Sequence, residues 1–202
     1  MKTVLLKKPG EIGISEIETT QRLDGQVLIK VRSAGICGSD IGAYKGVNPL
    51  VSYPRIIGHE IAGEVVEVGA DETEFKVGDR VILEPYVYCG KCYPCSIGHT
   101  NCCENLTVRG VHIEGGMAEY MLLTSTALVH KIPESISFDD ASIIEPLACA
   151  IHTVNRAEIG LEDVVVIAGA GPLGLFMVQI AHLKTPKKLI VVDPVDARLE
   201  LA

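Results

Sequence analysis

The stretch EDVVVIAGAGPLGLFMVQIAHLKTPKKLIVVDP, residues 162–194, decides the fold of the C-terminal part of the chain. Val164 to Ile167 form a continuous apolar run, which is typical of a parallel strand covered on both faces. A glycine-rich turn follows, and apolar residues then recur at helical spacing until Thr185-Pro186 ends the pattern. A second apolar run covers Leu189 to Val192. The order strand, glycine turn, helix, strand predicts the first part of a doubly wound α/β domain.

The glycines of this stretch form the pattern G-x-G-x-x-G between the first predicted strand and the helix. They allow a sharp turn, and they let N–H groups at the start of the helix approach a pyrophosphate. Asp193 follows the second strand, 24 residues after Gly169, which suits the residue that bonds a ribose 2′-hydroxyl. The residues expected to contact the dinucleotide are Gly169, Gly171, Pro172, Leu173, Gly174, Asp193 and Arg198.

The Asp193 carboxylate favours NAD, because a negative charge repels the 2′-phosphate of NADP. Arg198 could rest against the adenine, partly counter this preference, or form a surface ion pair with Glu200. A complete doubly wound sheet needs about six strands, and this sequence supplies two. We therefore expect an incomplete dinucleotide-binding domain that belongs to a longer enzyme.

Upstream, the stretch YCGKCYPCSIGHTNCCENL, residues 88–106, holds five of the seven cysteines. Its spacing C-x2-C-x2-C-x7-C lets a short loop surround one zinc ion with four thiolates. Cys102 could replace its neighbour as the fourth ligand. Four sulfur ligands leave no open position on the metal, so this ion would hold the loop and take no part in catalysis. The candidate ligands are Cys89, Cys92, Cys95 and Cys103.

A second group of metal-binding residue types is spread through the sequence. Cys37 lies in SAGICGSD, with Ser39 two positions later, whereas His59 and Glu60 are adjacent in IIGHEIAGEVVEVG. Glu145 begins the short motif EPL. None of these residues is decisive alone, because a lone histidine is more often a core or surface residue than a ligand.

The order of AGICGSD, GHE, GDRV, the four-cysteine loop, EPL and GAGPLG resembles the zinc-dependent medium-chain dehydrogenase/reductase family over essentially the whole chain. Members of this family combine a GroES-like catalytic domain with a Rossmann domain and hold a catalytic zinc. The resemblance implies that Cys37 and His59 bind this zinc, and that Glu60 binds it directly or lies just behind it. It implies that Glu145 is the remaining ligand or holds a zinc-bound water, and it favours Cys103 in the structural site.

The same resemblance implies a reaction. One thiolate and one imidazole would retain the zinc, and the open position would bind an alcohol, lower its pKa and favour hydride transfer to NAD. Ser39 stands where the family carries a hydroxyl that bonds the substrate oxygen, but Gly42 replaces the histidine with which many relatives continue the proton relay. Glu60 or Glu145, acting through a zinc-bound water, would then accept the proton.

The motifs are most similar to sorbitol-dehydrogenase-like enzymes, and they imply oxidation of a secondary hydroxyl of a polyol, sugar alcohol or sugar acid. One alternative is an L-threonine 3-dehydrogenase-like enzyme. The other is a structural zinc module without turnover, which would bind one zinc per chain where the enzyme binds two.

We expect a catalytic domain in residues 1–155 and the start of a dinucleotide-binding domain in residues 156–202. Short alternating or apolar runs, separated by Gly, Pro and Asp turns, predict a mostly β, antiparallel catalytic domain. Ser137 and Asp140 have capping-box spacing and predict a helix start. Its apolar stripe would contain Ala141, Ile144, Ala148 and Ile151.

Pro146 disfavours helical geometry at the residue before it, so we expect the Glu145 carboxylate to turn away from the preceding segment. This residue would then be free to approach the metal.

The composition limits the kinds of molecule that the protein is expected to bind. The 202 residues are 48% hydrophobic, enough for a real core, and their formal net charge of −8 argues against a nucleic-acid or anionic-membrane surface. The N-terminal apolar patch is too short for a signal peptide or a membrane span, which favours a cytoplasmic protein. We expect a small-molecule alcohol as substrate and, from the family resemblance, a homodimer or homotetramer.

Overall fold

The computed structural model describes residues 1–18, 22, 26–70, 72, 74–123 and 129–202. The chain divides into two compact units, Met1–Ile143 and Ile144–Ala202. The first unit contains antiparallel sheets and the second contains a parallel strand pair with helices, so the predicted α/β fold class is confirmed. The predicted domain boundary at residues 155–156 stays a prediction. Among the described helices, none has both the length and the apolar character needed to cross a membrane.

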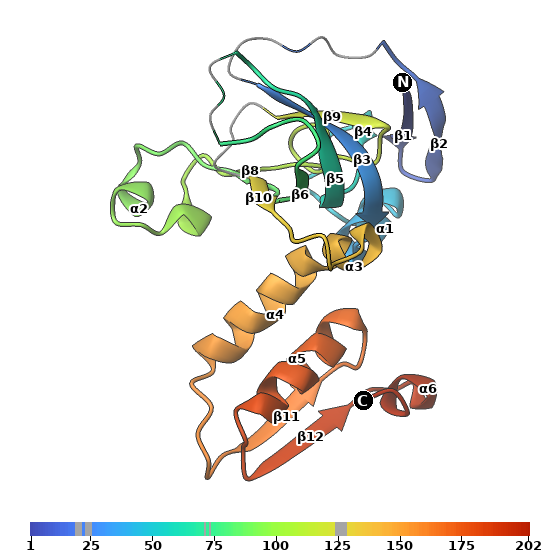
Figure 1. The fold of residues 1–202 in the computed structure, drawn as a ribbon. Helices are drawn as coiled ribbons and strands as arrows, with labels where there is room; N and C mark the ends of the chain where they lie inside the picture. Colours follow the sequence, from blue (N-terminus) through green and yellow to red (C-terminus); the bar gives the residue numbers. More distant parts are fainter. Residues whose placement is uncertain (19–21, 23–25, 71, 73, 124–128) are drawn as a thin grey trace. The chain divides into compact units, whose positions relative to one another are not determined.

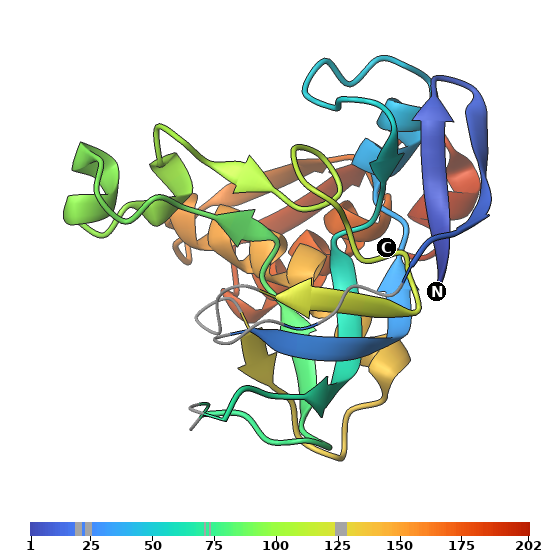
Figure 2. The same cartoon turned by 90° about the horizontal axis from the view of Figure 1, so that it is seen from above.

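The largest sheet of the first unit has five antiparallel strands in the order β10-β6-β5-β3-β9 (Figure 1, Figure 2). Strand β3 pairs with both β5 and β9. Its last residue, Gly35, lies opposite Glu60, one of the predicted metal ligands. The register of β3 shifts between Val31 and Ser33, as at a β-bulge. The strands are β3 Val27–Gly35, β5 Glu60–Glu67, β6 Arg80–Leu83, β9 Tyr120–Leu123 and β10 Val129–Lys131.

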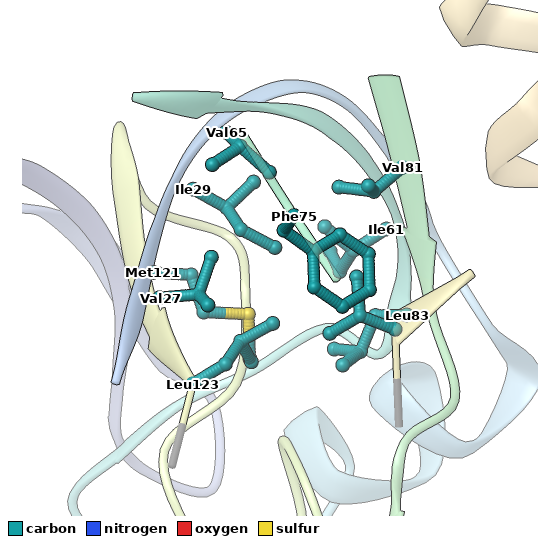
Figure 3. Close-up of a cluster of buried hydrophobic side chains, with 10 residues drawn as sticks. Val27, Ile29, Ile61, Val65, Phe75, Val81, Leu83, Met121 and Leu123 are labelled. Carbon is teal, nitrogen blue, oxygen red and sulfur yellow. The ribbon is translucent and has the colours of Figure 1, made fainter. Parts of the chain in front are cut away.

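Apolar side chains from this sheet form the main core of the first unit (Figure 3). Val27 and Ile29 are buried on the same face of β3, because side chains alternate along a strand. Phe75 joins them from a connecting segment. Burial of one such aliphatic side chain contributes about 1.5–3 kcal/mol. The cluster comprises Val27, Ile29, Ile61, Val65, Phe75, Val81, Leu83, Met121, Leu123 and Val129.

A second sheet has the order β2-β1-β4 and packs with helix α1 around a smaller core. Leu6 of β1 and Ala43 of α1 meet Ile57 in this core. The cluster therefore ties the start of α1 to the segment that leads into β5. These elements are β1 Lys2–Lys8, β2 Glu11–Glu16, α1 Gly38–Tyr44 and β4 Arg55–Ile56.

The helix predicted from Ser137 begins as expected but is interrupted. The Ser137 hydroxyl accepts a hydrogen bond from the Asp140 backbone N–H at 3.0 Å, and α3 Phe138–Ser142 follows. Ile143 ends α3 with non-helical dihedral angles, and α4 Ile144–Arg156 begins directly after it. The predicted single apolar stripe is therefore wrong, since Ile151 is 42% exposed. In α4 the buried positions are Ala150 and Val154.

The structure also corrects the predicted conformation of Glu145. The residue lies in the first turn of α4, although its neighbour Pro146 is predicted to disfavour helical geometry there. A proline in the first helical turn does little harm, because N–H groups at a helix start have no partner within the helix. This position outweighs the tendency of a residue before proline to be extended.

The second unit confirms the predicted strand, glycine turn, helix and strand. β11 Val164–Ala168 and β12 Lys188–Val192 pair in parallel, and α5 Pro172–Leu183 connects them, with the short helix α6 Asp196–Leu199 after β12. Val154, Ile167 and Ala181 form its buried core. The helix breaks where Thr185, at φ +53°, precedes Pro186.

Candidate functional site

The four predicted structural ligands come together in one loop of the first unit. The loop leaves the sheet through the strand pair β7 Tyr86–Val87 and β8 Thr107–Val108, and it carries α2 Tyr93–Ser96 (Figure 1). The sulfur atoms of the cluster all lie within 4.8 Å of one another. Cys102 is exposed and lies outside the cluster. The members are Cys89, Cys92, Cys95 and Cys103, a donor set that fits a tetrahedral zinc ion.

Backbone N–H groups prepare these sulfur atoms for a cation. The N–H groups of Cys89 and Asn105 each donate to Cys103 Sγ at 3.3 Å. The backbone N–H groups of Lys91 and Cys92 lower the pKa of Cys89 to about 6. Desolvation and the neighbouring Cys92 sulfur raise the pKa of Cys95 to about 12. The loop thus holds at least one thiolate at neutral pH before a metal arrives.

A second cluster joins Cys37, His59 and Glu60. One ligand atom of each residue lies within 4.8 Å of the others. His59 and Glu60 are buried, each 7% exposed, and Cys37 is half-buried at the start of α1. One sulfur, one nitrogen and one carboxylate fit a zinc ion that retains a position for another ligand. The cysteine cluster thus has the four donors of a closed metal site, whereas the second cluster has the three donors of an open one.

Asp40 fastens the segments that carry this second cluster. Its carboxylate accepts hydrogen bonds from the backbone N–H of Cys37 at 2.9 Å and of Gly58 at 3.3 Å. It also lies 4.0 Å from His59 Nδ1, and it is only 4% exposed. One buried carboxylate therefore holds both Cys37, which caps the start of α1, and the turn before His59. Such partners orient metal ligands and raise their affinity.

Gly35 makes room for the Glu60 side chain. The two residues are paired across β3 and β5. A Cβ atom on Gly35 would overlap the carboxylate and the Cβ of Glu60. Only glycine leaves space for the Glu60 carboxylate to lie on this side of the sheet, next to Cys37 and His59.

The environment of Cys37 favours the thiolate. The hydrogen bond with His59 lowers the pKa of Cys37, the hydroxyl and backbone N–H of Ser39 act in the same direction, and burial opposes them. The Ser39 hydroxyl oxygen is buried and has no well-aligned hydrogen-bond partner among the described residues. A buried hydroxyl that lies near a metal-binding thiol without a well-aligned bond suits a ligand whose oxygen would complete its hydrogen bonding.

Glu145 belongs to the second unit, where the Cys149 thiol lies 3.9 Å from its Oε1 atom. The cluster in the first unit consists of the three other predicted residues. The role of Glu145 at the metal stays a prediction.

The glycine turn of the second unit has the geometry expected for a dinucleotide. Gly169 has φ +105°, a backbone conformation that side chains disfavour. A Cβ atom on Gly174 would overlap the carbonyl oxygen of Gly169, so the helix packs closely on the turn. Gly171 is the N-cap of α5, Pro172 is its first residue, and Leu173 follows. The first N–H groups of α5 thus lie at a turn that leaves space for phosphate.

Asp193 lies at the end of β12 but already has backbone partners. Its Oδ2 accepts from the Ala170 N–H at 2.8 Å, and its Oδ1 accepts from the Val195 N–H at 2.8 Å. These two bonds lower the pKa of Asp193, and the Arg198 guanidinium at 3.7 Å adds to the effect. Arg198 therefore forms its ion pair with Asp193. An ion pair with Glu200 was one of the predicted alternatives.

Sequence reasoning missed two residues of the metal site. Asp40 had a local signal, since an acid three residues after Cys37 can cap the start of a helix. Gly35 had none, because its contact with Glu60 depends on the register of two strands that are distant in sequence.

Comparison with known proteins identifies the family. Residues 23–134, more than half of the chain, match the family model "Alcohol dehydrogenase GroES-like domain". An "Uncharacterized zinc-type alcohol dehydrogenase-like protein" of Haemophilus influenzae is 47% identical over 100% of this chain and 59% of its own length. An L-galactonate-5-dehydrogenase of Escherichia coli is 40% identical over 99% of this chain and 58% of its own length. The chain thus spans about three-fifths of these relatives.

A solved structure shows the same arrangement of the chain. The crystal structure of RspB from Escherichia coli, complexed with the cofactor NADH, has a TM-score of 0.91 and 43% sequence identity. The match covers 99% of this chain and 58% of that one. Together with the two metal-binding clusters and the glycine turn, these likenesses show that the chain belongs to the zinc-dependent medium-chain alcohol dehydrogenase family.

Proposed function

We propose that the whole protein is a zinc-dependent oxidoreductase that transfers hydride from a secondary alcohol to NAD. The observation that carries this proposal is the buried cluster of Cys37, His59 and Glu60, whose ligand atoms lie within 4.8 Å of one another. Three protein donors of mixed chemistry are typical of a catalytic zinc site, whereas the four-sulfur loop is typical of a structural one.

The residues of the chain have distinct tasks in this reaction. Zinc would polarise the alcohol oxygen and NAD would accept the hydride. Cys37 and His59 hold the metal, and Asp40 fixes both of them through backbone bonds and its approach to the imidazole. The Ser39 hydroxyl, whose oxygen lacks a well-aligned partner among the described residues, accepts the proton of the alcohol.

The onward path of that proton runs through a carboxylate. Gly42 carries no side chain that could continue a relay from Ser39. Glu60 lies within the metal cluster of the first unit and is one candidate for this role. Glu145, from the second unit, is the other candidate for this role, and Glu60→Gln and Glu145→Gln variants would separate the two.

NAD is the coenzyme that the second unit supports best. Asp193 presents a negative charge at the end of β12, the position expected to bond a ribose 2′-hydroxyl. The RspB structure contains NADH, which agrees with this choice. The substrate class we favour is a polyol or sugar acid, in keeping with the L-galactonate enzyme at 40% identity. An L-threonine 3-dehydrogenase-like activity is the alternative.

The test is a screen of NAD reduction by the full-length protein with polyols, sugar acids and L-threonine. We expect turnover with one of the first two classes, and we expect Cys37→Ala to abolish it because the metal loses its thiolate. Cys102→Ala is the matched control, since Cys102 is an exposed thiol outside both clusters. Turnover that survives in Cys37→Ala would reject the mechanism.

Metal analysis separates the enzyme from a structural module without turnover. The enzyme should hold two zinc ions per chain, and a module with only the cysteine loop should hold one. Cys37→Ala should lower the ratio from two to one, whereas Cys102→Ala should leave it at two.

A further inference from the structure

Arg109 is a buried cation whose guanidinium has no partner among the residues that the structure describes. The residue is only 7% exposed. Its Nε atom has no hydrogen-bond partner, and in the described part of the chain no ion pair reaches the guanidinium. Arg55 offers a contrast, because its Nη1 atom lies 2.9 Å from Glu114 Oε1. Arg109 therefore differs from an arginine whose charge is balanced within the protein.

An unbalanced guanidinium in this position requires an explanation. Burial lowers the pKa of Arg109, since desolvation disfavours the charged form, yet a guanidinium stays protonated at neutral pH. Buried charges are as a rule paired or bound to a ligand of opposite charge. The chain carries 26 acidic residues against 18 basic ones, so a shortage of carboxylates cannot account for the missing partner.

The backbone brings the residue after Arg109 against the residue before His59. The Arg109 N–H donates to the Pro85 carbonyl at 3.0 Å, and the next residue, Gly110, packs on the backbone of Gly58. A Cβ atom on Gly110 would lie 2.9 Å from the nitrogen and the oxygen of Gly58. Gly58 directly precedes His59. Since consecutive Cα atoms are about 3.8 Å apart, the long side chain of Arg109 starts within reach of a molecule held at His59.

The loop around Arg109 is also firmly attached to this segment. The N–H groups of Gly115, Gly116 and Met117 donate to the carbonyls of residues 56–58 at 2.7–3.0 Å. A guanidinium on so fixed a loop is oriented before a ligand arrives. Its planar set of donors matches two oxygens of a carboxylate or a phosphate.

We propose that Arg109 binds an anionic group, a carboxylate or a phosphate, on the alcohol substrate, at a distance from the hydroxyl that is oxidised. This inference rests on the proposed function and narrows its substrate class. The natural substrate is then a sugar acid or a sugar phosphate, and a neutral polyol of the same configuration binds less well.

The experiment compares three ligands that share the galacto configuration: galactitol, L-galactonate and galactitol 1-phosphate. Each is titrated calorimetrically into the full-length, zinc-loaded protein without coenzyme, so that no turnover occurs. We expect one of the two anions to bind about 30-fold or more tightly than galactitol, and its identity distinguishes carboxylate from phosphate recognition. Arg109→Met should bring the affinity for that anion close to the affinity for galactitol, whereas Arg109→Lys should retain part of the difference.

Arg32→Met is the matched control, because it removes the same charge from an exposed position of the first unit. This variant should keep the anion preference. Equal binding of all three ligands by the wild type, or an equal loss for all three in Arg109→Met, would overturn the proposal.

Turnover assays then separate this inference from the proposed function. Anion preference that depends on Arg109, without NAD reduction by any ligand, would sustain the binding site and reject the dehydrogenase reaction. Equal NAD reduction with galactitol and both anions, in the wild type and in Arg109→Met, would sustain the reaction and reject the role of Arg109.

Discussion

Gly35 lies opposite Glu60 in the register of β3 and β5, and its missing side chain determines where the Glu60 carboxylate can lie. The glycine has no unusual backbone conformation, so its importance comes from space alone. A single methyl group would compete with the acid for the same volume. The metal site thus depends on a residue that binds no metal.

We predict that Gly35→Ala weakens zinc binding at the open cluster by about 10–100-fold, because Glu60 must move away from Cys37 and His59. Competition with a chelator, followed by metal analysis, measures the loss. Gly13→Ala is the control, since Gly13 has open space around its Cα and an ordinary backbone conformation. Equal zinc affinity in Gly35→Ala and the wild type would contradict this reading of the register.

Two cysteines of the loop, Cys89 and Cys95, differ in charge before zinc binds. The pKa of Cys89 is lowered to about 6 by backbone N–H groups, whereas that of Cys95 is raised to about 12. At pH 7 the first is thus mostly thiolate and the second is thiol. Because only the thiolate is nucleophilic, the two residues should react at different rates.

In metal-free protein at pH 7, we predict that iodoacetamide modifies Cys89 well before Cys95. The rate at Cys89 should level off above pH 7 and fall below pH 6, whereas the rate at Cys95 should still rise at pH 9. Peptide mass spectrometry of timed samples measures both rates, and the exposed Cys102 serves as the internal reference. Similar pH profiles for Cys89 and Cys95 would show that the backbone does not distinguish them.

At the scale of elements, the start of α1 and the turn before β5 are connected by Asp40. The carboxylate satisfies the N–H groups of Cys37 and Gly58, and Ala43 of the same helix packs against Ile57. The position of α1 is therefore fixed by both polar and apolar contacts. This connection brings together two metal ligands that are 22 residues apart in the chain.

We predict that Asp40→Ala lowers the free energy of unfolding by about 1–3 kcal/mol, since it leaves N–H groups of Cys37 and Gly58 without an acceptor. Zinc affinity at the open cluster should fall by about tenfold or more. Urea unfolding and chelator competition measure the two effects. Asp163→Ala, which removes a comparable bond to the Gly160 N–H, should leave zinc affinity unchanged.

Local sequence patterns predicted the elements of the second unit closely. Apolar runs and helical spacing mark β11, α5 and β12 because each pattern lies within the element itself. The helix that contains Glu145 was harder to predict. A proline is tolerated in the first turn of a helix, but it disfavours helical geometry at the residue before it. The sequence around Pro146 does not show where the first turn begins, so it does not show which effect decides.

At the scale of the whole molecule, the coenzyme site needs more strands than the two in the second unit. Backbone groups of this unit nevertheless already hold the Asp193 carboxylate. The Ala170 and Val195 backbone bonds lower its pKa, so the carboxylate is charged when a nucleotide approaches. The same charge favours a ribose hydroxyl and disfavours a phosphate.

For the full-length protein we predict that Asp193→Ala weakens NAD binding about tenfold or more and improves the ratio of NADP to NAD binding, because the repulsion of the 2′-phosphate is removed. Coenzyme fluorescence titrations with NADH and NADPH measure both affinities. Leu199→Ala, in the nearby short helix α6, should preserve the wild-type ratio. An unchanged ratio in Asp193→Ala would mean that Asp193 only holds the turn at Ala170 and does not select the coenzyme.

The cysteine loop and the glycine turn could be predicted from short spacings, whereas Cys37, His59 and Glu60 were predicted from the order of several motifs that resembles a known family. Around them, only the bond of Asp40 to Cys37 had a local signal, because an acid three residues after the N-cap can bond back to it. The bond of Asp40 to Gly58, the contact of Gly35 with Glu60 and the missing counter-charge of Arg109 arise only when distant segments are folded together.

The cysteine loop also determines how the protein must be handled. The sulfur atoms of Cys92 and Cys95 lie 3.4 Å apart, so removing the ion in air would expose adjacent thiols to oxidation. A disulfide formed there would occupy two of the four donors and block re-entry of the metal. After purification with a strong chelator and without reductant, the loop would therefore bind zinc again only once the disulfide was reduced.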